Sequence, residues 1–155
     1  MGLLGGFLKK RQEIEYSKIV EDVIEILDTI GYIHHCEHLK GTFKNYNYDY
    51  FSINTWKYEN REEELLMYVD GKEDEFEPSF DWIRQGADLY RIIYIENFHD
   101  CEDMLLRFAH EYFKKFPDDI FYDELDWYYT KEDIDEIMKR PFDKDWCYKN
   151  PKDFL

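Results

Sequence analysis

The chain has 155 residues, and its 36 acidic side chains outnumber its 20 basic ones, for a formal net charge of −16. A chain this acidic is excluded from binding nucleic acid through a general basic surface. With only 7 glycines and 4 prolines it is not collagenous, and an aromatic content of 19% excludes a disordered chain. The composition predicts a folded acidic domain with an aromatic core.

The first predicted element is a helix that ends at Gly31. Apolar residues recur at helical spacing between Ile19 and Ile30, with Ser17 as the expected N-cap and Gly31 as the expected left-handed terminal residue. The apolar run from Gly2 to Leu8 is too short for a membrane span. We expect residues 1–16 to be a loosely docked segment. The alternative is a docking tip for a membrane surface or a partner, formed by Leu3, Leu4, Phe7 and Leu8.

Strands are predicted in the middle of the chain. Residues 46–58 and 64–69 are rich in aromatic and β-branched side chains, which favour strands. Residues 88–97 are apolar on both faces, as is typical of a central strand. Residues 32–39 fit either a strand or a helix.

Two more helices are predicted towards the C-terminus. An apolar stripe runs from Met104 to Phe116 with Asp100 as its expected N-cap, and Thr130 with Asp133 approximates a capping box. The expected fold is therefore α+β, one domain over residues 1–155. We expect a central antiparallel sheet of three to four strands, covered by an N-terminal helix and two C-terminal helices.

The acidic residues are concentrated in two segments. Residues 59–81 hold ten acids and two bases, and residues 117–136 hold nine acids and one base, so each segment has a net charge of −8. Both segments also contain tryptophan, tyrosine or phenylalanine. The pattern fits either a solvated surface or a face that attracts a basic protein and anchors it with aromatic side chains.

The densest set of metal-ligand types is His34-His35-Cys36-Glu37-His38. On a strand, His34, Cys36 and His38 would share one face and offer donors that suit zinc or copper. Alternate residues of a strand are about 6.5 Å apart, so convergence on one ion is difficult. We expect a surface strand or turn here and predict no cofactor.

Catalytic motifs are not found in the sequence. Cys101 lies at a predicted strand-to-helix corner, where a helix N-terminus favours the thiolate, but Asp100 and Glu102 oppose it. We expect a helix cap with a buried cysteine rather than a nucleophile. Three widely spaced cysteines (Cys36, Cys101 and Cys147) argue against a disulfide framework, so we expect a reducing, cytoplasmic compartment.

A stretch near the C-terminus, about a sixth of the chain, resembles a known class of proteins. The run FYDELDWYY (121–129), followed by TKEDI (130–134) and PFDKDW (141–146), is similar to small acidic immunity proteins of bacterial polymorphic-toxin and contact-dependent inhibition systems. The resemblance implies a non-catalytic protein that blocks one cognate toxin domain, commonly a basic nuclease, without binding nucleic acid or membrane itself. The alternatives are an acidic inhibitor of another basic protein, and a metal-binding protein or metal-dependent enzyme that uses residues 34–38.

The resemblance also implies which residues touch the toxin. Carboxylates of the immunity protein would take the place of nucleic-acid phosphates and pair with the basic groups of the toxin. Two aromatic side chains would anchor the toxin. The carboxylates are Asp118, Asp119, Asp123, Glu124 and Asp126, with Glu73, Asp74 and Glu75 from the first acidic segment, and the aromatic anchors are Trp127 and Tyr128.

Overall fold

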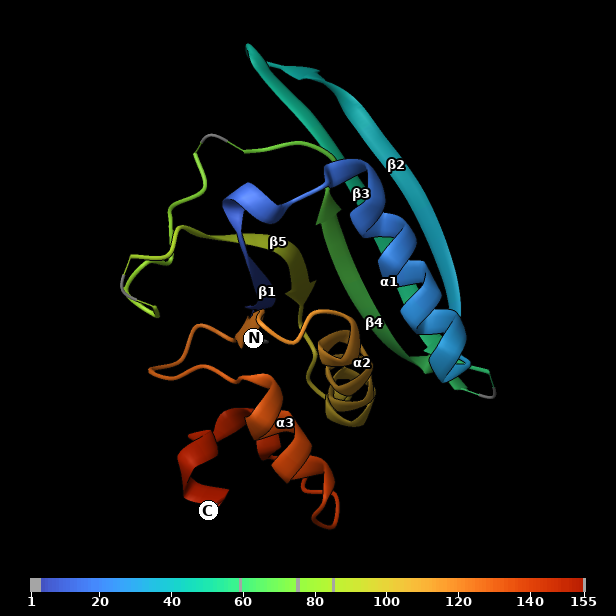
Figure 1. The fold of residues 1–155 in the computed structure, drawn as a ribbon. Coiled ribbons are helices and arrows are strands. Elements are labelled where there is room, and N and C mark those ends of the chain that lie inside the picture. Colours follow the sequence, from blue (N-terminus) through green and yellow to red (C-terminus); the bar gives the residue numbers. More distant parts are fainter. Residues whose placement is uncertain (1–3, 59, 75, 85, 155) are drawn as a thin grey trace.

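The structure, a computed structural model, describes residues 4–58, 60–74, 76–84 and 86–154. These residues form one six-stranded antiparallel sheet and three α-helices (Figure 1). The order along the chain is β1 (Leu4–Lys10), α1 (Tyr16–Ile30), β2 (Ile33–Phe43), β3 (Tyr46–Lys57), β4 (Asn60–Asp70), β5 (Leu89–Glu96), α2 (Glu102–Lys115), β6 (Ile120–Tyr122) and α3 (Lys131–Met138). The strand order within the sheet is β2-β3-β4-β5-β1-β6.

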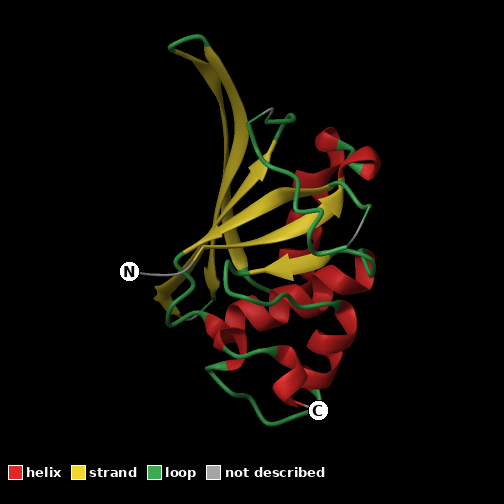
Figure 2. Ribbon diagram, turned by 90° about the vertical axis from the view of Figure 1, so that its left-hand side faces the viewer, coloured by secondary structure: helices red, strands yellow, loops and turns green. Residues whose placement is uncertain are grey.

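The helices gather on one side of the sheet, and the β2–β3 hairpin projects beyond the body of the domain (Figure 2). The α+β class and the antiparallel sheet are as expected. The expected three to four strands are wrong, because β1 and β6 join the four strands formed by the middle of the chain. The expected helix placement is also inexact, since α1 follows a strand and β6 separates α2 from α3.

The expectation that residues 1–16 are loosely docked is wrong for the described part of that segment. Strand β1 pairs with β5 on one side and β6 on the other, and Phe7 and Leu8 are fully buried. The same burial excludes these two side chains from a docking tip, while Leu3 lies outside the described residues. A Cβ on Gly6 would lie 2.6 Å from the Ile93 carbonyl oxygen, so the glycine is needed for this close strand packing.

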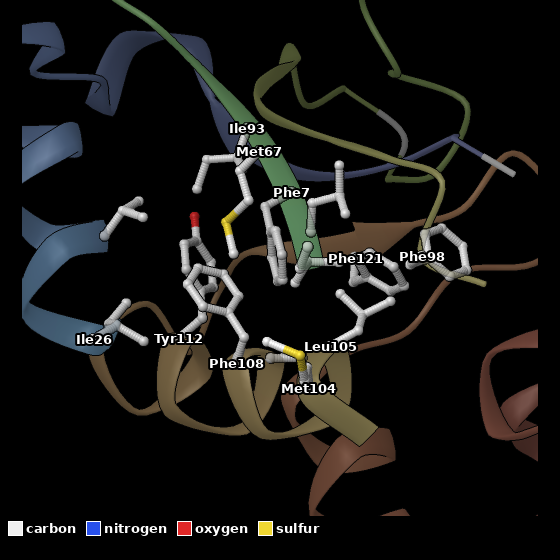
Figure 3. Close-up of a cluster of buried hydrophobic side chains, with 14 of the residues drawn as sticks. Phe7, Ile26, Met67, Ile93, Phe98, Met104, Leu105, Phe108, Tyr112 and Phe121 are labelled. Carbon is white, nitrogen blue, oxygen red and sulfur yellow. The ribbon is translucent and has the colours of Figure 1, made fainter. Parts of the chain in front are cut away.

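The main core lies between the sheet and the helices. Phe7 of β1 contacts the rings of Phe108 and Tyr112 of α2 and of Phe121 of β6, with centroids 4.2–5.6 Å apart (Figure 3). Ile26 of α1 and Met67 of β4 belong to the same buried cluster. A smaller buried cluster joins the loop before β5 to strands β1, β5 and β6, and it consists of Leu8, Phe80, Ile83, Leu89 and Ile120.

Several local expectations are confirmed and two need correction. Gly31 ends α1 with φ +89°, as expected. Residues 32–39 fitted either a strand or a helix, and the structure has a strand over residues 33–43 that pairs along its length with β3. The N-cap of α1 is Glu15 rather than Ser17, and the N-cap of α2 is Cys101. Asp100 has φ +68° and belongs to the preceding turn.

The predicted capping box of α3 is present. Thr130 caps the helix by accepting a hydrogen bond from the Asp133 backbone, and the Asp133 carboxylate accepts one from the Thr130 N–H at 2.9 Å. We expect Thr130→Ala to lower the free energy of unfolding by about 1 kcal/mol, because it leaves a helix N–H without its partner. Urea denaturation measures this loss.

The matched control is Thr29→Ala in the last turn of α1, where the threonine is exposed. Alanine has the higher helix propensity, so this variant should be at least as stable as the wild type. An equal loss in both variants would contradict a capping role for Thr130.

Candidate partner-binding surface

The two acidic segments, separated by 35 residues in the sequence, meet in the structure through Arg91. This side chain of β5 is buried, and its Nε lies 3.2 Å from Glu77 Oε1 while its Nη1 lies 2.7 Å from Glu124 Oε1. Its charge is therefore compensated within the protein. The surrounding carboxylates dominate the potential outside.

Aromatic contacts hold the same two segments together. Tyr122 of β6 packs edge-to-face against Phe80 and Trp82, with ring centroids 5.8 and 5.4 Å apart. Arg84 donates to the backbone carbonyl of Asp118 at 2.9 Å. Trp82 remains 56% exposed despite its contact with Tyr122.

We call this region the acidic face and define it by the following residues: Asp81, Trp82, Asp118, Tyr122, Glu124 and Asp126. Burial raises the pKa of Tyr122, and the charges of Glu124, Asp123 and Asp126 add to this shift while Arg91 opposes it. The negative charge of the neighbouring carboxylates is therefore felt at the Tyr122 hydroxyl, within the acidic face. A cationic side chain placed against Trp82 would meet both negative charge and a π-surface.

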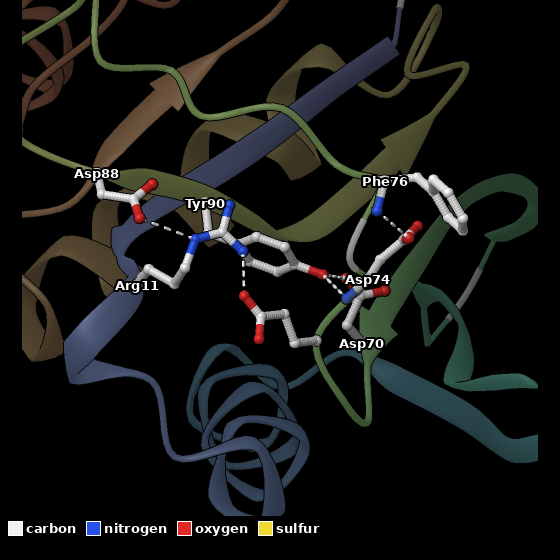
Figure 4. Close-up of polar contacts among 7 residues, drawn as sticks. Arg11, Asp70, Asp74, Phe76, Asp88 and Tyr90 are labelled. Carbon is white, nitrogen blue, oxygen red and sulfur yellow. Dashed lines mark hydrogen bonds and ion pairs between the residues drawn. The ribbon is translucent and has the colours of Figure 1, made fainter.

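The first acidic segment is fastened to the body by a second polar cluster (Figure 4). Arg11 ion-pairs with Glu73 at 2.6 Å and with Asp88 at 3.1 Å. Tyr90 donates its hydroxyl hydrogen to the Asp70 carboxylate and accepts the Asp74 N–H at 2.9 Å. These contacts position the loop that carries Trp82.

The predicted site residues in this first segment therefore have an anchoring role. Glu73 is held by Arg11, and the Asp74 carboxylate accepts the Phe76 N–H at 3.0 Å. Glu75 lies outside the described residues. Trp82 was not among the predicted site residues, although its position next to Asp81 in an acidic loop was an available signal.

Two carboxylates predicted to touch a partner are buried, and that expectation is corrected. Asp119 is 5% exposed, with Lys9 Nζ at 2.8 Å and the Tyr112 hydroxyl donating at 2.6 Å. Asp123 is fully buried, and its burial raises its pKa to about 7. The sequence places both beside exposed acids, but the close packing of β6 turns them inward.

The predicted anchors Trp127 and Tyr128 are partly buried and lie next to the acidic face. Trp127 donates its indole N–H to the Tyr129 hydroxyl at 3.0 Å, which restricts its ring. Both residues line a pocket of about 340 Å³ that Asp126 and Lys152 also border. The acidic face and this pocket therefore share Asp126.

The predicted metal-ligand types of β2 do not converge. His34 and His38 each contact a carboxylate of their own, Asp28 at 2.8 Å and Asp49 at 2.7 Å respectively. Within the described part of the chain, the potential metal ligands that come together are His99, Asp100 and Glu102. His34, Cys36 and His38 are not among them. The expectation of a surface strand at these residues is confirmed by their place on β2, at the sheet edge.

Cys101 lacks the properties of a nucleophile. It is 3% exposed, and burial raises the pKa of its thiol to about 11, with Glu63 as the next contributor. The Sγ–H donates to the Glu64 carbonyl at 3.4 Å. The expected buried cysteine is confirmed. The N-cap position of α2, expected at Asp100, is occupied by Cys101 itself.

Comparison of the chain with models of known protein families, with curated proteins and with solved structures gives no match. Across the described residues, the helices are all too short or too polar to cross a membrane.

Proposed function

We propose that the protein is a non-catalytic inhibitor that binds one basic protein partner through its acidic face. The observation that carries the proposal is the meeting of two acidic segments around an exposed tryptophan, Trp82, with Arg91 neutralised beneath them. Clustered carboxylates accelerate capture of a basic partner, and an exposed aromatic ring supplies short-range affinity.

We further propose that the partner is a toxin domain of the nuclease type, and that the protein is its immunity protein in the cytoplasm. The resemblance of residues 121–146 supports this assignment. The exposed carboxylates of the acidic face support it as well, because they can pair with the basic groups that a nuclease uses to bind phosphates. The three cysteines, all in the described part of the chain, are unpaired, as a reducing compartment requires.

The test is capture of the partner from a lysate of the source organism, followed by affinity measurement on the purified pair. We expect one stoichiometric basic protein whose association rate falls as salt is raised. Trp82→Ala should weaken its binding by about 2 kcal/mol, roughly 30-fold, because a central aromatic anchor is lost. If the partner is a toxin, its expression alone should arrest growth, and co-expression of the wild-type protein should restore it.

The matched control is Tyr58→Ala, which removes another exposed aromatic ring. Tyr58 is 80% exposed, directly follows β3, and is not one of the residues that define the acidic face. It should bind within twofold of the wild type. Equal affinities for the Trp82→Ala and wild-type proteins would rule out the acidic face as the binding site. A captured partner that is not basic would remove the inhibitor proposal itself.

A further inference from the structure

A second acidic region lies at the junction between β5 and α2. A pocket of about 520 Å³ is bounded there by the first half of β4, the turn after β5, the first turn of α2 and the tail at Phe142 and Lys144. Its acidic lining residues are Glu62, Glu63, Glu64, Asp100, Glu102 and Asp103. Lys144 is the one basic residue among those that line it, so the pocket carries a strong negative potential.

Three of the side chains at this pocket bring metal-ligand atoms together. One ligand atom each from His99, Asp100 and Glu102 lies within 4.8 Å of the other two. His99 Nε2 is 3.6 Å from Asp100 Oδ1. One imidazole nitrogen with two carboxylate oxygens is a donor set that Zn²⁺ and Mn²⁺ accept.

Glu102 supplies an independent indication of a ligand. The residue is 4% exposed, and its Oε2 is buried with no hydrogen-bond partner among the described residues. A buried carboxylate oxygen without a partner is costly, so such groups in folded proteins nearly always have one. A cation between Glu102 and its two neighbours would provide that partner.

Contacts of Glu102 and of the neighbouring Cys101 hold the turn that carries the three ligands. The buried Trp146 donates its indole N–H to the Glu102 carbonyl at 2.8 Å, and the Cys101 N–H donates to the Phe98 carbonyl at 2.9 Å. Cys101 Sγ contacts the Glu64 carbonyl and thereby ties the turn to β4. The backbone of this turn is therefore preorganised, which lowers the entropic cost of binding.

We propose that His99, Asp100 and Glu102 bind one divalent cation of the Zn²⁺ or Mn²⁺ class, with water in the remaining positions. Asp103 is outside this set because it pairs with Lys57. The cation joins the turn after β5 to the first turn of α2. A cation that binds the folded turn more tightly than the unfolded chain stabilises the fold by mass action.

The test uses chelator-stripped protein and Mn²⁺ as the probe, with free Mn²⁺ measured by electron paramagnetic resonance. We expect one Mn²⁺ per chain, displaced by equimolar Zn²⁺ but not by Mg²⁺. In ¹H–¹⁵N spectra, Mn²⁺ should broaden the amides of residues 99–103 and the indole of Trp146. The melting temperature of the wild type should rise when Mn²⁺ is added.

Glu102→Gln and His99→Ala should each weaken Mn²⁺ binding at least tenfold. His99 is largely exposed, so its replacement leaves the fold intact, and melting in chelator verifies this for both variants. Asp126→Asn removes one charge from the acidic face and should bind Mn²⁺ within twofold of the wild type. Wild-type affinity in Glu102→Gln, or equal broadening of residues 118–126, would overturn the proposal.

Discussion

Phe7→Ala should lower the free energy of unfolding by roughly 3–5 kcal/mol, the usual cost of removing a fully buried phenylalanine. Phe7 is 0% exposed and contacts rings of α2 and β6, so its loss leaves a cavity between the sheet and the helices. Urea unfolding followed by tryptophan fluorescence measures the effect. A loss of this size is a large fraction of the stability of a domain of this length.

The control is Leu4→Ala, at the start of the same strand, where the side chain is 37% exposed. Its expected cost is below about 1 kcal/mol, because little apolar area returns to water. If Phe7→Ala were no more destabilising than Leu4→Ala, residues 4–10 would be loosely docked after all. The two variants together thus test whether β1 is an integral strand of the sheet or a loosely docked segment.

The stability of the protein should fall as the pH rises from about 4 to about 7. Burial raises the pKa of Asp123 from 3.8 to about 7, so the folded chain retains a proton that the unfolded chain has released. The resulting stabilisation is complete below about pH 4 and is lost as the pH passes 7. A shift of this size corresponds to at most about 4 kcal/mol.

Asp123→Asn should flatten this decline, because the amide remains neutral throughout the range. At pH 8 the variant should be more stable than the wild type, and near pH 4 the two should be similar. Part of the slope should persist, since burial also raises the pKa of Asp70 to about 6. Denaturation midpoints measured between pH 4 and 8 give the comparison.

The control for this prediction is Asp126→Asn, which removes an exposed carboxylate three residues away. It should keep the wild-type decline, because that carboxylate is hydrated in the folded and the unfolded chain. Two results would contradict a raised pKa for the buried Asp123 carboxyl. One is a wild-type stability that rises between pH 4 and 7, and the other is a pH dependence of stability that is unchanged in Asp123→Asn.

In the second acidic segment, the structure leaves three of the predicted partner-binding carboxylates exposed and buries two others. Asp118, Glu124 and Asp126 are on the acidic face, whereas Asp119 and Asp123 are not. The sequence shows charge but not orientation, and a three-residue strand such as β6 has too few positions for a reliable alternation pattern. Trp82 becomes central only because Tyr122, from the second acidic segment, packs against it.

The elements predicted correctly from the sequence depend on local interactions. The apolar periodicities of α1, α2 and α3 are each complete within one helix. The capping box joins residues three positions apart, and Gly31 adopts a backbone conformation that glycine favours. Neighbouring residues therefore carry enough information to predict these features without knowledge of the rest of the chain.

Tertiary structure decided the features that depend on distant residues. Strand β1 contains two adjacent glycines, so its pattern is weak, and its burial follows from pairing with strands about 85 and 115 residues later in the chain. Arg91 joins acidic segments that no local pattern relates. The sequence by itself determined the helices, the strong strands and the overall charge. Which carboxylates face solvent and which are buried depended on long-range packing, because burial is set by what covers a residue.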